Sequence, residues 1–219
     1  MRIVVLSCDK NEDIFYAFHH CIEKYWNGHP EVIYLTETFE NPYYKTICKN
    51  YLLNKWTRRI RESLEEIDDN EIMLMIDDIF IRKNVDKERI EYARENLKGN
   101  IAMFNFEKSF DKEDIETTLK GFKKRRKGSE YELSLMCGLW QKEKLIDVLS
   151  GESDPWSVEY NQDTKDYDYY INSEDYIIDW GYKTFERVGL VKGKWAREVV
   201  PFFEKEGIEI DYEKRGFID

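Results

Sequence analysis

The chain has 219 residues and a formal net charge of −11, and 36% of its residues are charged. This acidity argues against a general affinity for nucleic-acid phosphates or anionic lipid, while the length suits one large α/β domain or a domain with an appended lobe. The scattered cysteines indicate neither a zinc site nor a disulfide framework, and we expect a cytoplasmic protein because neither a signal sequence nor an apolar run of membrane-spanning length is present.

The start of the chain predicts a β-α-β unit. The β-branched run Arg2–Leu6 is typical of a buried strand, apolar residues from Ile14 to Trp26 recur at helical spacing, and Val32–Thr36 is a second strand-like run. A right-handed crossover makes the two strands parallel neighbours. This arrangement places three polar residues at the carboxyl edge of the sheet: Ser7, Asp9 and Lys10. They are candidates for ligand binding. Neither a Rossmann glycine motif nor a P-loop motif is present.

Residues 37–53 are Tyr-rich, and we expect an irregular loop over the edge of the sheet. A helix follows, and its predicted buried stripe consists of Trp56, Ile60, Leu64 and Ile67. Arg58, Arg59 and Arg61 are expected on or near its exposed side. Cations near a helix start do not offset the macrodipole, so Arg58 and Arg61 are candidates for binding a diphosphate, with an ordinary surface position as the alternative.

The stretch Glu71–Phe80, EIMLMIDDIF, predicts a strand that is buried on both faces in the middle of a parallel sheet. Two adjacent carboxylates, Asp77 and Asp78, follow its apolar run. Ligands of open α/β sheets bind at the carboxyl ends of such strands, so this pair is a candidate for holding a cation or for accepting hydrogen bonds from ligand hydroxyls. A strand that ends in a solvated turn is the alternative.

A basic block at residues 120–128, KGFKKRRKG, stands out in this acidic chain. The elements predicted around it are a helix at Val85–Leu97, strands at Ile101–Phe106 and Tyr131–Trp140, and a helix at Lys142–Leu149. A charge run of this length is typical of a solvated loop. Near a site it would instead attract an anionic acceptor or a phosphate.

The segment ESDPWSVEY predicts a helix that begins at Pro155 and is capped by Asp154 or Ser153. Trp156 and Glu159 then lie three residues apart on one face. An aromatic ring beside a carboxylate suits a sugar, because the ring covers a C–H face while the acid accepts a hydroxyl proton. A capped helix start with a buried Trp and an exposed Glu is the alternative.

Beyond Tyr160 the sequence alternates Tyr with Asp, and we expect a strand at Tyr176–Trp180. We predict an α/β core at residues 1–160 and a smaller C-terminal lobe or lid at residues 161–219, packed on the same domain. No histidine lies near the acids in the sequence, so a Ser-His-Asp or Cys-His mechanism is not supported.

The chain resembles small bacterial and phage glycosyltransferases of the GT-A group. The resemblance lies in the order of LSCDK at a strand end, W-x-R-R in a helix, LMIDD at a later strand end, GLW before a helix and DPWSVE after it. It covers most of residues 1–160 and the segment GLVKGKW. It implies a GT-A-like, mostly parallel sheet flanked by helices, a nucleotide-sugar donor with a UDP-sugar favoured, and a hydroxyl acceptor on a surface polysaccharide or other glycan.

The resemblance also implies roles for individual residues. Asp9 approaches the nucleotide, Asp77 and Asp78 hold the diphosphate with Mg²⁺ or Mn²⁺, and Asp78 and Glu159 are catalytic, with Glu159 as the base on the acceptor. The residues expected to bind substrate are Ser7, Asp9, Lys10, Arg58, Arg61, Asp77, Trp140 and Trp156. The motif departs from the usual Asp-x-Asp, which leaves the metal requirement open, although one carboxylate and the donor phosphates suffice for Mg²⁺.

Three other functions fit parts of the sequence. A phage enzyme that glycosylates DNA bases would use the basic block, although the net charge opposes it. A non-catalytic protein would use the acids only to recognise a nucleotide or a sugar. A phosphatase-type domain would need a nucleophilic Asp after an early strand, and Asp9-Lys10 lacks the DxDxT pattern.

Overall fold

The computed structural model describes residues 1–161, 163–181 and 189–218, so parts of the predicted C-terminal lobe (162, 182–188 and 219) lie outside the described residues. The strands of the main sheet are β1 (Arg2–Leu6), β2 (Val32–Thr36), β3 (Lys45–Cys48), β4 (Glu71–Ile76), β5 (Ile101–Lys108), β6 (Phe122–Lys124), β7 (Cys137–Gln141) and β8 (Asp168–Asn172). The helices are α1 (Phe15–Tyr25), α2 (Trp56–Leu64), α3 (Lys87–Asn96), α4 (Lys142–Val148), α5 (Pro155–Asn161) and α6 (Val200–Glu206).

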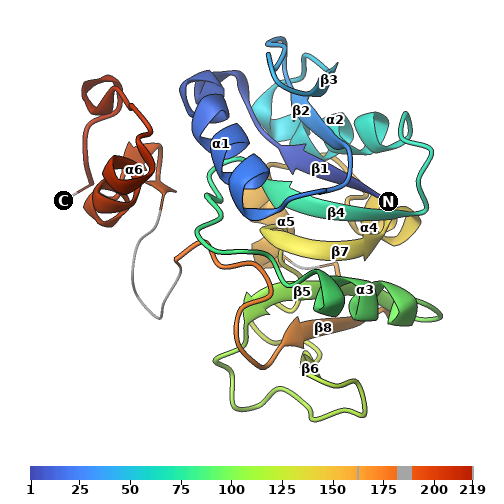
Figure 1. The fold of residues 1–219 in the computed structure, drawn as a ribbon. Coiled ribbons are helices and arrows are strands. Elements are labelled where there is room, and N and C mark those ends of the chain that lie inside the picture. Colours follow the sequence, from blue (N-terminus) through green and yellow to red (C-terminus); the bar gives the residue numbers. More distant parts are fainter. Residues whose placement is uncertain (162, 182–188, 219) are drawn as a thin grey trace.

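Strands β1 to β8 form one mixed sheet in the order β3-β2-β1-β4-β7-β5-β8-β6 (Figure 1). β1 pairs in parallel with β2 and β4, and β2 pairs in parallel with β3. β7 is inserted antiparallel to both of its neighbours, β4 and β5. The predicted fold class, an α/β fold with a mostly parallel sheet flanked by helices, is confirmed.

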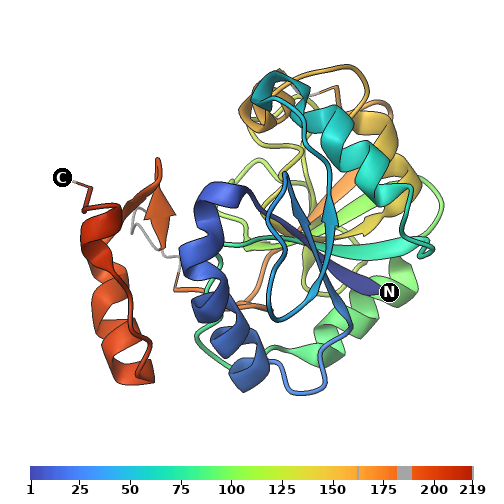
Figure 2. The same cartoon turned by 90° about the horizontal axis from the view of Figure 1, so that it is seen from above.

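Helices cover both faces of the sheet, which explains why its central strands β1 and β4 are apolar after their first residues (Figure 2). Successive residues of β1 alternate between two cores. Ile3 and Val5 share one core with α1 and α3, whereas Val4 and Leu6 share the other with α2 and α4. Among the residues that the structure describes, no helix combines the length and the apolar character needed to cross a membrane.

Several elements differ from the sequence prediction. β3 lies in the segment expected to be a loop and extends the sheet beside β2. The strand expected at Tyr131–Trp140 begins only at Cys137, because the residues before it turn along the carboxyl edge, starting at Tyr131 with a φ of 53°. No strand forms within Tyr176–Trp180, all of whose residues the structure describes. The strand between β5 and β6 is instead β8. The side chains of Ile177 and Trp180 are buried without strand pairing.

The C-terminal segment packs beside α1, away from the sheet (Figures 1 and 2). A hairpin of β9 (Leu190–Val191) and β10 (Lys194–Trp195) leads into α6. The rings of Trp195 and Phe203 contact Phe80, just beyond β4, with centroids 6.2 Å and 4.9 Å away. Glu206 at the end of α6 accepts a hydrogen bond from Lys24 Nζ of α1 at 2.6 Å. These contacts hold the segment next to the end of β4.

Gly189 sits where this segment meets the strand end. Its φ is +76°, and a Cβ added there would lie 2.6 Å from the carbonyl oxygen of Asp78. We expect Gly189→Ala to lower the free energy of unfolding by about 3 kcal/mol, since the strain of a left-handed alanine adds to overpacking.

Gly193→Ala is the matched control. Gly193 has a φ of +78°, but no atom lies within 4 Å of an added Cβ, so only backbone strain of about 1–2 kcal/mol is expected. Urea unfolding of the two variants measures the difference. Equal losses of stability would contradict the close packing of residue 189 against Asp78.

Candidate functional site

A cavity of about 320 Å³ opens at the carboxyl edge of the sheet, where β1, β2 and β4 end side by side. The first residue after each of these strands lines it: Ser7 follows β1, Glu37 follows β2 and Asp77 follows β4. Helix α5 supplies part of the opposite wall with Trp156 and Glu159. The cavity therefore brings together the predicted acidic motif and the predicted Trp-Glu corner.

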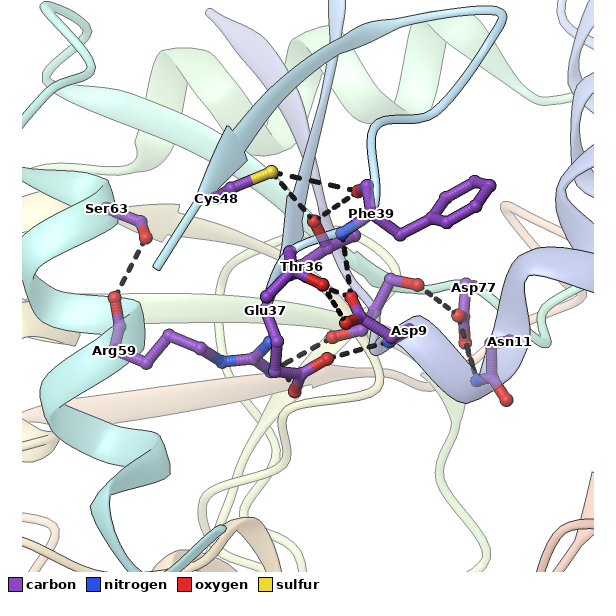
Figure 3. A network of polar contacts seen from close by, with 11 residues as sticks. Asp9, Asn11, Thr36, Glu37, Phe39, Cys48, Arg59, Ser63 and Asp77 are labelled. Carbon is purple, nitrogen blue, oxygen red and sulfur yellow. Dashed lines mark hydrogen bonds and ion pairs between the residues drawn. The ribbon is translucent and has the colours of Figure 1, made fainter. Parts of the chain in front are cut away.

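The carboxylate of Asp77 is held by two side chains from the first residues of the sequence, and one of these is itself held by Arg215. Asp77 is buried and accepts hydrogen bonds from the Ser7 hydroxyl at 2.5 Å and from Asn11 Nδ2 at 2.9 Å (Figure 3). Arg215 of the C-terminal segment donates to Asn11 Oδ1 at 3.1 Å, and the same guanidinium pairs with Asp13. The arginine thus fixes the orientation in which the Asn11 amide nitrogen meets Asp77. Sequence analysis missed both Asn11 and Arg215, because no local pattern links residues 204 positions apart.

Arg59 is the arginine that borders the cavity. Its side chain is 2% exposed; Nη2 donates to the Ser7 carbonyl oxygen at 2.9 Å, and Nη1 forms an ion pair with Glu37 Oε1 at 2.6 Å (Figure 3). The prediction that it lies on or near the exposed side of its helix is wrong. Position 59 lies three residues after Trp56 and four before Ser63, both buried, so helical periodicity assigns it to the buried stripe.

Asp78 borders the cavity beside Asp77, and no other described residue donates a hydrogen bond to its carboxylate. Burial raises the pKa of both carboxyl groups, and the charge of Asp77 raises the pKa of Asp78 further. Such an oxygen-only pair fits a hard cation such as Mg²⁺ or Mn²⁺. Within the described part of the chain, no group of three or more His, Cys, Asp or Glu residues is placed to hold a metal, so a cation here would take further ligands from substrate and water.

Helix α5 begins at Pro155, as predicted, and Asp154 caps it by accepting the N–H of the third helical residue at 2.9 Å. Trp156 is 58% exposed, whereas Glu159 is half-buried, which is the reverse of the alternative with a buried Trp and an exposed Glu. Glu159 Oε1 accepts the N–H of Leu135 at 2.8 Å, and burial raises the pKa of Glu159. An oriented carboxylate with raised proton affinity suits general acid–base chemistry.

Other predicted substrate-binding residues do not line this cavity: Asp9, Lys10, Arg58 and Arg61. Asp9 uses both carboxylate oxygens on the turn after β2, where Thr38 donates its N–H at 2.9 Å and its hydroxyl at 2.6 Å (Figure 3). Lys10 is exposed, and Arg58 forms an ion pair with Glu62 one turn further along α2. Roles for these residues in ligand binding remain predictions.

Trp140 is placed where it cannot contact a ligand at this edge, so its prediction as a substrate-binding residue is wrong. Its side chain is 0% exposed and packs against Tyr169 of β8, with ring centroids 6.0 Å apart. Because β7 runs antiparallel to β4, Trp140 pairs with Ile72 at the start of β4, at the opposite end from Asp77.

The basic block is not simply a solvated loop, since residues 122–124 form β6 at an edge of the sheet. Its cations with acidic partners are Lys123, Lys124, Arg125, Arg126 and Lys127. Arg125 is buried, and its Nη1 lies 3.0 Å from Asp114 Oδ2. Because these cations already have partners, the block offers little free positive charge for a nucleic-acid backbone.

No protein-family model matches the sequence, and no curated protein matches it. Similar solved structures include a cytidylyltransferase from Leptospira borgpetersenii, with 9% identity, coverage of 80% of this chain and 76% of that chain, and a TM-score of 0.49. HddC from Yersinia pseudotuberculosis has 12% identity, coverage of 81% and 91%, and a TM-score of 0.49. The glycosyltransferase GlyE from Streptococcus pneumoniae has 8% identity, coverage of 75% and 40%, and a TM-score of 0.44. These similarities concern the fold and assign no activity to this chain.

Proposed function

We propose that the protein is a glycosyltransferase that moves a sugar from a nucleotide-sugar donor, a UDP-sugar in first place, to a hydroxyl group of a glycan acceptor. The proposal rests on one observation: the same cavity is bordered by Asp77 and Asp78 on one side and by Trp156 and Glu159 on the other. A sugar bound between these walls would have its leaving group near the aspartates and its attacking hydroxyl near Glu159.

The aspartate wall suits the diphosphate of the donor. Asp78, with Asp77, would hold Mg²⁺ or Mn²⁺ together with diphosphate oxygens. When bound, such a cation neutralises charge on the departing nucleoside diphosphate. Ser7 and Asn11 hold Asp77 in place before any ligand arrives, so the wall is preorganised. Arg59, in its ion pair with Glu37, fixes the edge of the same cavity.

The α5 wall suits the transfer step. Glu159 would take the proton of the acceptor hydroxyl while the hydroxyl oxygen bonds to the anomeric carbon of the donor sugar. The bond between that carbon and the diphosphate oxygen breaks in the same step, and the nucleoside diphosphate leaves with the electron pair. Attack in line with the leaving group inverts the anomeric configuration. The exposed ring of Trp156 would cover a C–H face of the sugar.

A thermal-shift screen of UDP-, GDP-, CMP- and dTDP-sugars, with and without Mn²⁺, tests the proposal. We expect one donor, a UDP-sugar in first place, to raise Tm by about 5–10 °C at about 100 times its Kd. Asp78→Asn should remove the Mn²⁺-dependent part of this rise. Asp68→Asn is the matched control, because Asp68 is exposed near the opposite end of β4.

The screen has clear contrary outcomes. If no nucleotide sugar changes Tm at millimolar concentration, the proposed transfer is wrong. If Asp78→Asn responds like the native protein, the role of Asp78 in holding the cation and the diphosphate is wrong. The free nucleoside triphosphates belong in the same screen. A rise in Tm with a triphosphate and with no nucleotide sugar would indicate nucleotidyl transfer instead.

A further inference from the structure

A second cavity, of about 410 Å³, adjoins the first. The two cavities share Met136 and Glu159 in their walls. Ligands held in the two cavities would therefore meet at Glu159. In the proposed function, this carboxylate takes the proton of the acceptor hydroxyl. This volume lies within the range of small-molecule sites.

The polar groups of the second cavity are already arranged for a ligand. Glu107 Oε2 accepts hydrogen bonds from Asn105 Nδ2 at 3.1 Å and from Ser134 Oγ at 3.2 Å, whereas no described residue donates to Oε1. Arg125 lies in the same wall and is more than nine-tenths buried; its Nη1 donates to Asp114, but its Nε has no hydrogen-bond partner within the described chain. Unpartnered polar atoms of this kind call for a ligand or water.

Two exposed aromatic side chains complete the cavity: Phe110, which is 50% exposed, and Tyr131, which is 42% exposed. Rings beside carboxylates and a hydroxyl suit a saccharide, whose C–H faces pack on the rings while its hydroxyls bond to the polar groups. The wall contains two carboxylates, whereas its cations Arg125 and Lys108 already form ion pairs with Asp114 and Asp175, which lie outside it. The carboxylates accept hydroxyl protons and disfavour an anion, which suits an uncharged saccharide.

We infer that the second cavity is the acceptor subsite and that it takes an uncharged saccharide, one hydroxyl of which lies at Glu159. Glu107 binds neighbouring hydroxyls of this saccharide and thereby selects among acceptors. This inference rests on the proposed function, because the cavity is an acceptor site only if the first cavity holds a donor.

Met136 provides a direct probe, since it lies in the shared wall, whereas Met73, Met75 and Met103 are buried in the core. Protein labelled with ¹³C at the methionine methyl groups is titrated with the methyl glycosides of glucose, galactose, N-acetylglucosamine and rhamnose, with and without the donor found by thermal shift. We expect at least one glycoside to move the Met136 signal and to leave the Met75 signal in place.

Glu107→Gln and Phe110→Ala should each weaken this binding about tenfold, because a hydrogen bond to a charged group or an aromatic contact is lost. Glu65→Gln is the matched control, since Glu65 is exposed at the end of α2, outside the second cavity.

The outcomes separate this inference from the proposed function. If the donor moves the Met136 signal and no glycoside does, or if both variants bind the glycoside like the native protein, the acceptor subsite is wrong and the transferase proposal stands. If a glycoside binds as expected but no donor does, the cavity remains a saccharide site, while its role as an acceptor subsite and the proposed transfer reaction are both wrong.

Discussion

Replacing Arg59 with alanine is expected to lower the free energy of unfolding by about 2–4 kcal/mol and to abolish donor binding. The change removes the ion pair with Glu37 and the hydrogen bond to the Ser7 carbonyl oxygen. It leaves a carboxylate at the cavity edge without its cation and a void where a buried side chain lay. Urea unfolding measures the stability, and calorimetric titration with the donor measures the affinity.

The neighbouring residue supplies the control. Arg58→Ala removes an arginine of the same helix whose exposed side chain pairs with Glu62, and its Tm and donor affinity should stay close to those of the native protein. The Tm and the donor affinity of Arg59→Lys should lie between those of Arg59→Ala and Arg58→Ala. Lysine keeps the charge but cannot bridge two partners with a planar guanidinium group. A larger loss of donor affinity in Arg58→Ala than in Arg59→Ala would indicate that the exposed face of α2 binds the diphosphate.

Glu159→Gln is expected to lower kcat by about 10²–10⁴-fold and to leave Tm and donor affinity nearly unchanged. The amide oxygen of glutamine can still accept the N–H of Leu135, so the helix and the cavity keep their shape. The amide cannot take a proton from the acceptor. Product formation under saturating donor and acceptor measures kcat. Glu152→Gln is the control, since Glu152 is exposed just before α5.

The pH dependence of the proposed transfer reaction in the native protein provides a second readout. A general base acts only when it is ionised, so kcat/KM should fall as the pH is lowered through the pKa of Glu159. Burial raises that pKa, which places the loss of activity at a higher pH than for an exposed glutamate. Activity in Glu159→Gln near the native level, with an unchanged acid limb, would assign the base to another group.

The sequence was informative where a local pattern determines the outcome. The apolar run before Asp77 predicted a strand buried on both faces, and β4 has that place between β1 and β7. Pro155 and its acidic cap predicted the start of α5. Both features depend on residues close together in the chain, for which spacing and capping chemistry are sufficient.

The remaining parts of the site depend on contacts that no local pattern encodes. Tryptophan is a residue type that suits a sugar site. Because β7 is inserted antiparallel to β4, however, Trp140 lies in the core. Arg59 could have been assigned to the buried stripe from the spacing of its helix, yet its ion-pair partner Glu37 follows a strand that the sequence does not connect to it. Sheet order and long-range pairing decide these positions, and a single sequence leaves both open.

The hydrogen bonds of Arg215 bear on how the protein is made. The residue lies close to the end of the described chain, yet its guanidinium reaches Lys10 and Asn11 at the beginning. During translation, the opening β-α-β unit can emerge from the ribosome and pair its strands long before Arg215 is synthesised. The Asn11 amide therefore gains its arginine partner only after a closure that spans 204 residues, a contact of the kind that forms slowly. Removal of residues 215–218 would release Asn11, and with it the carboxylate of Asp77, before it disturbs the sheet.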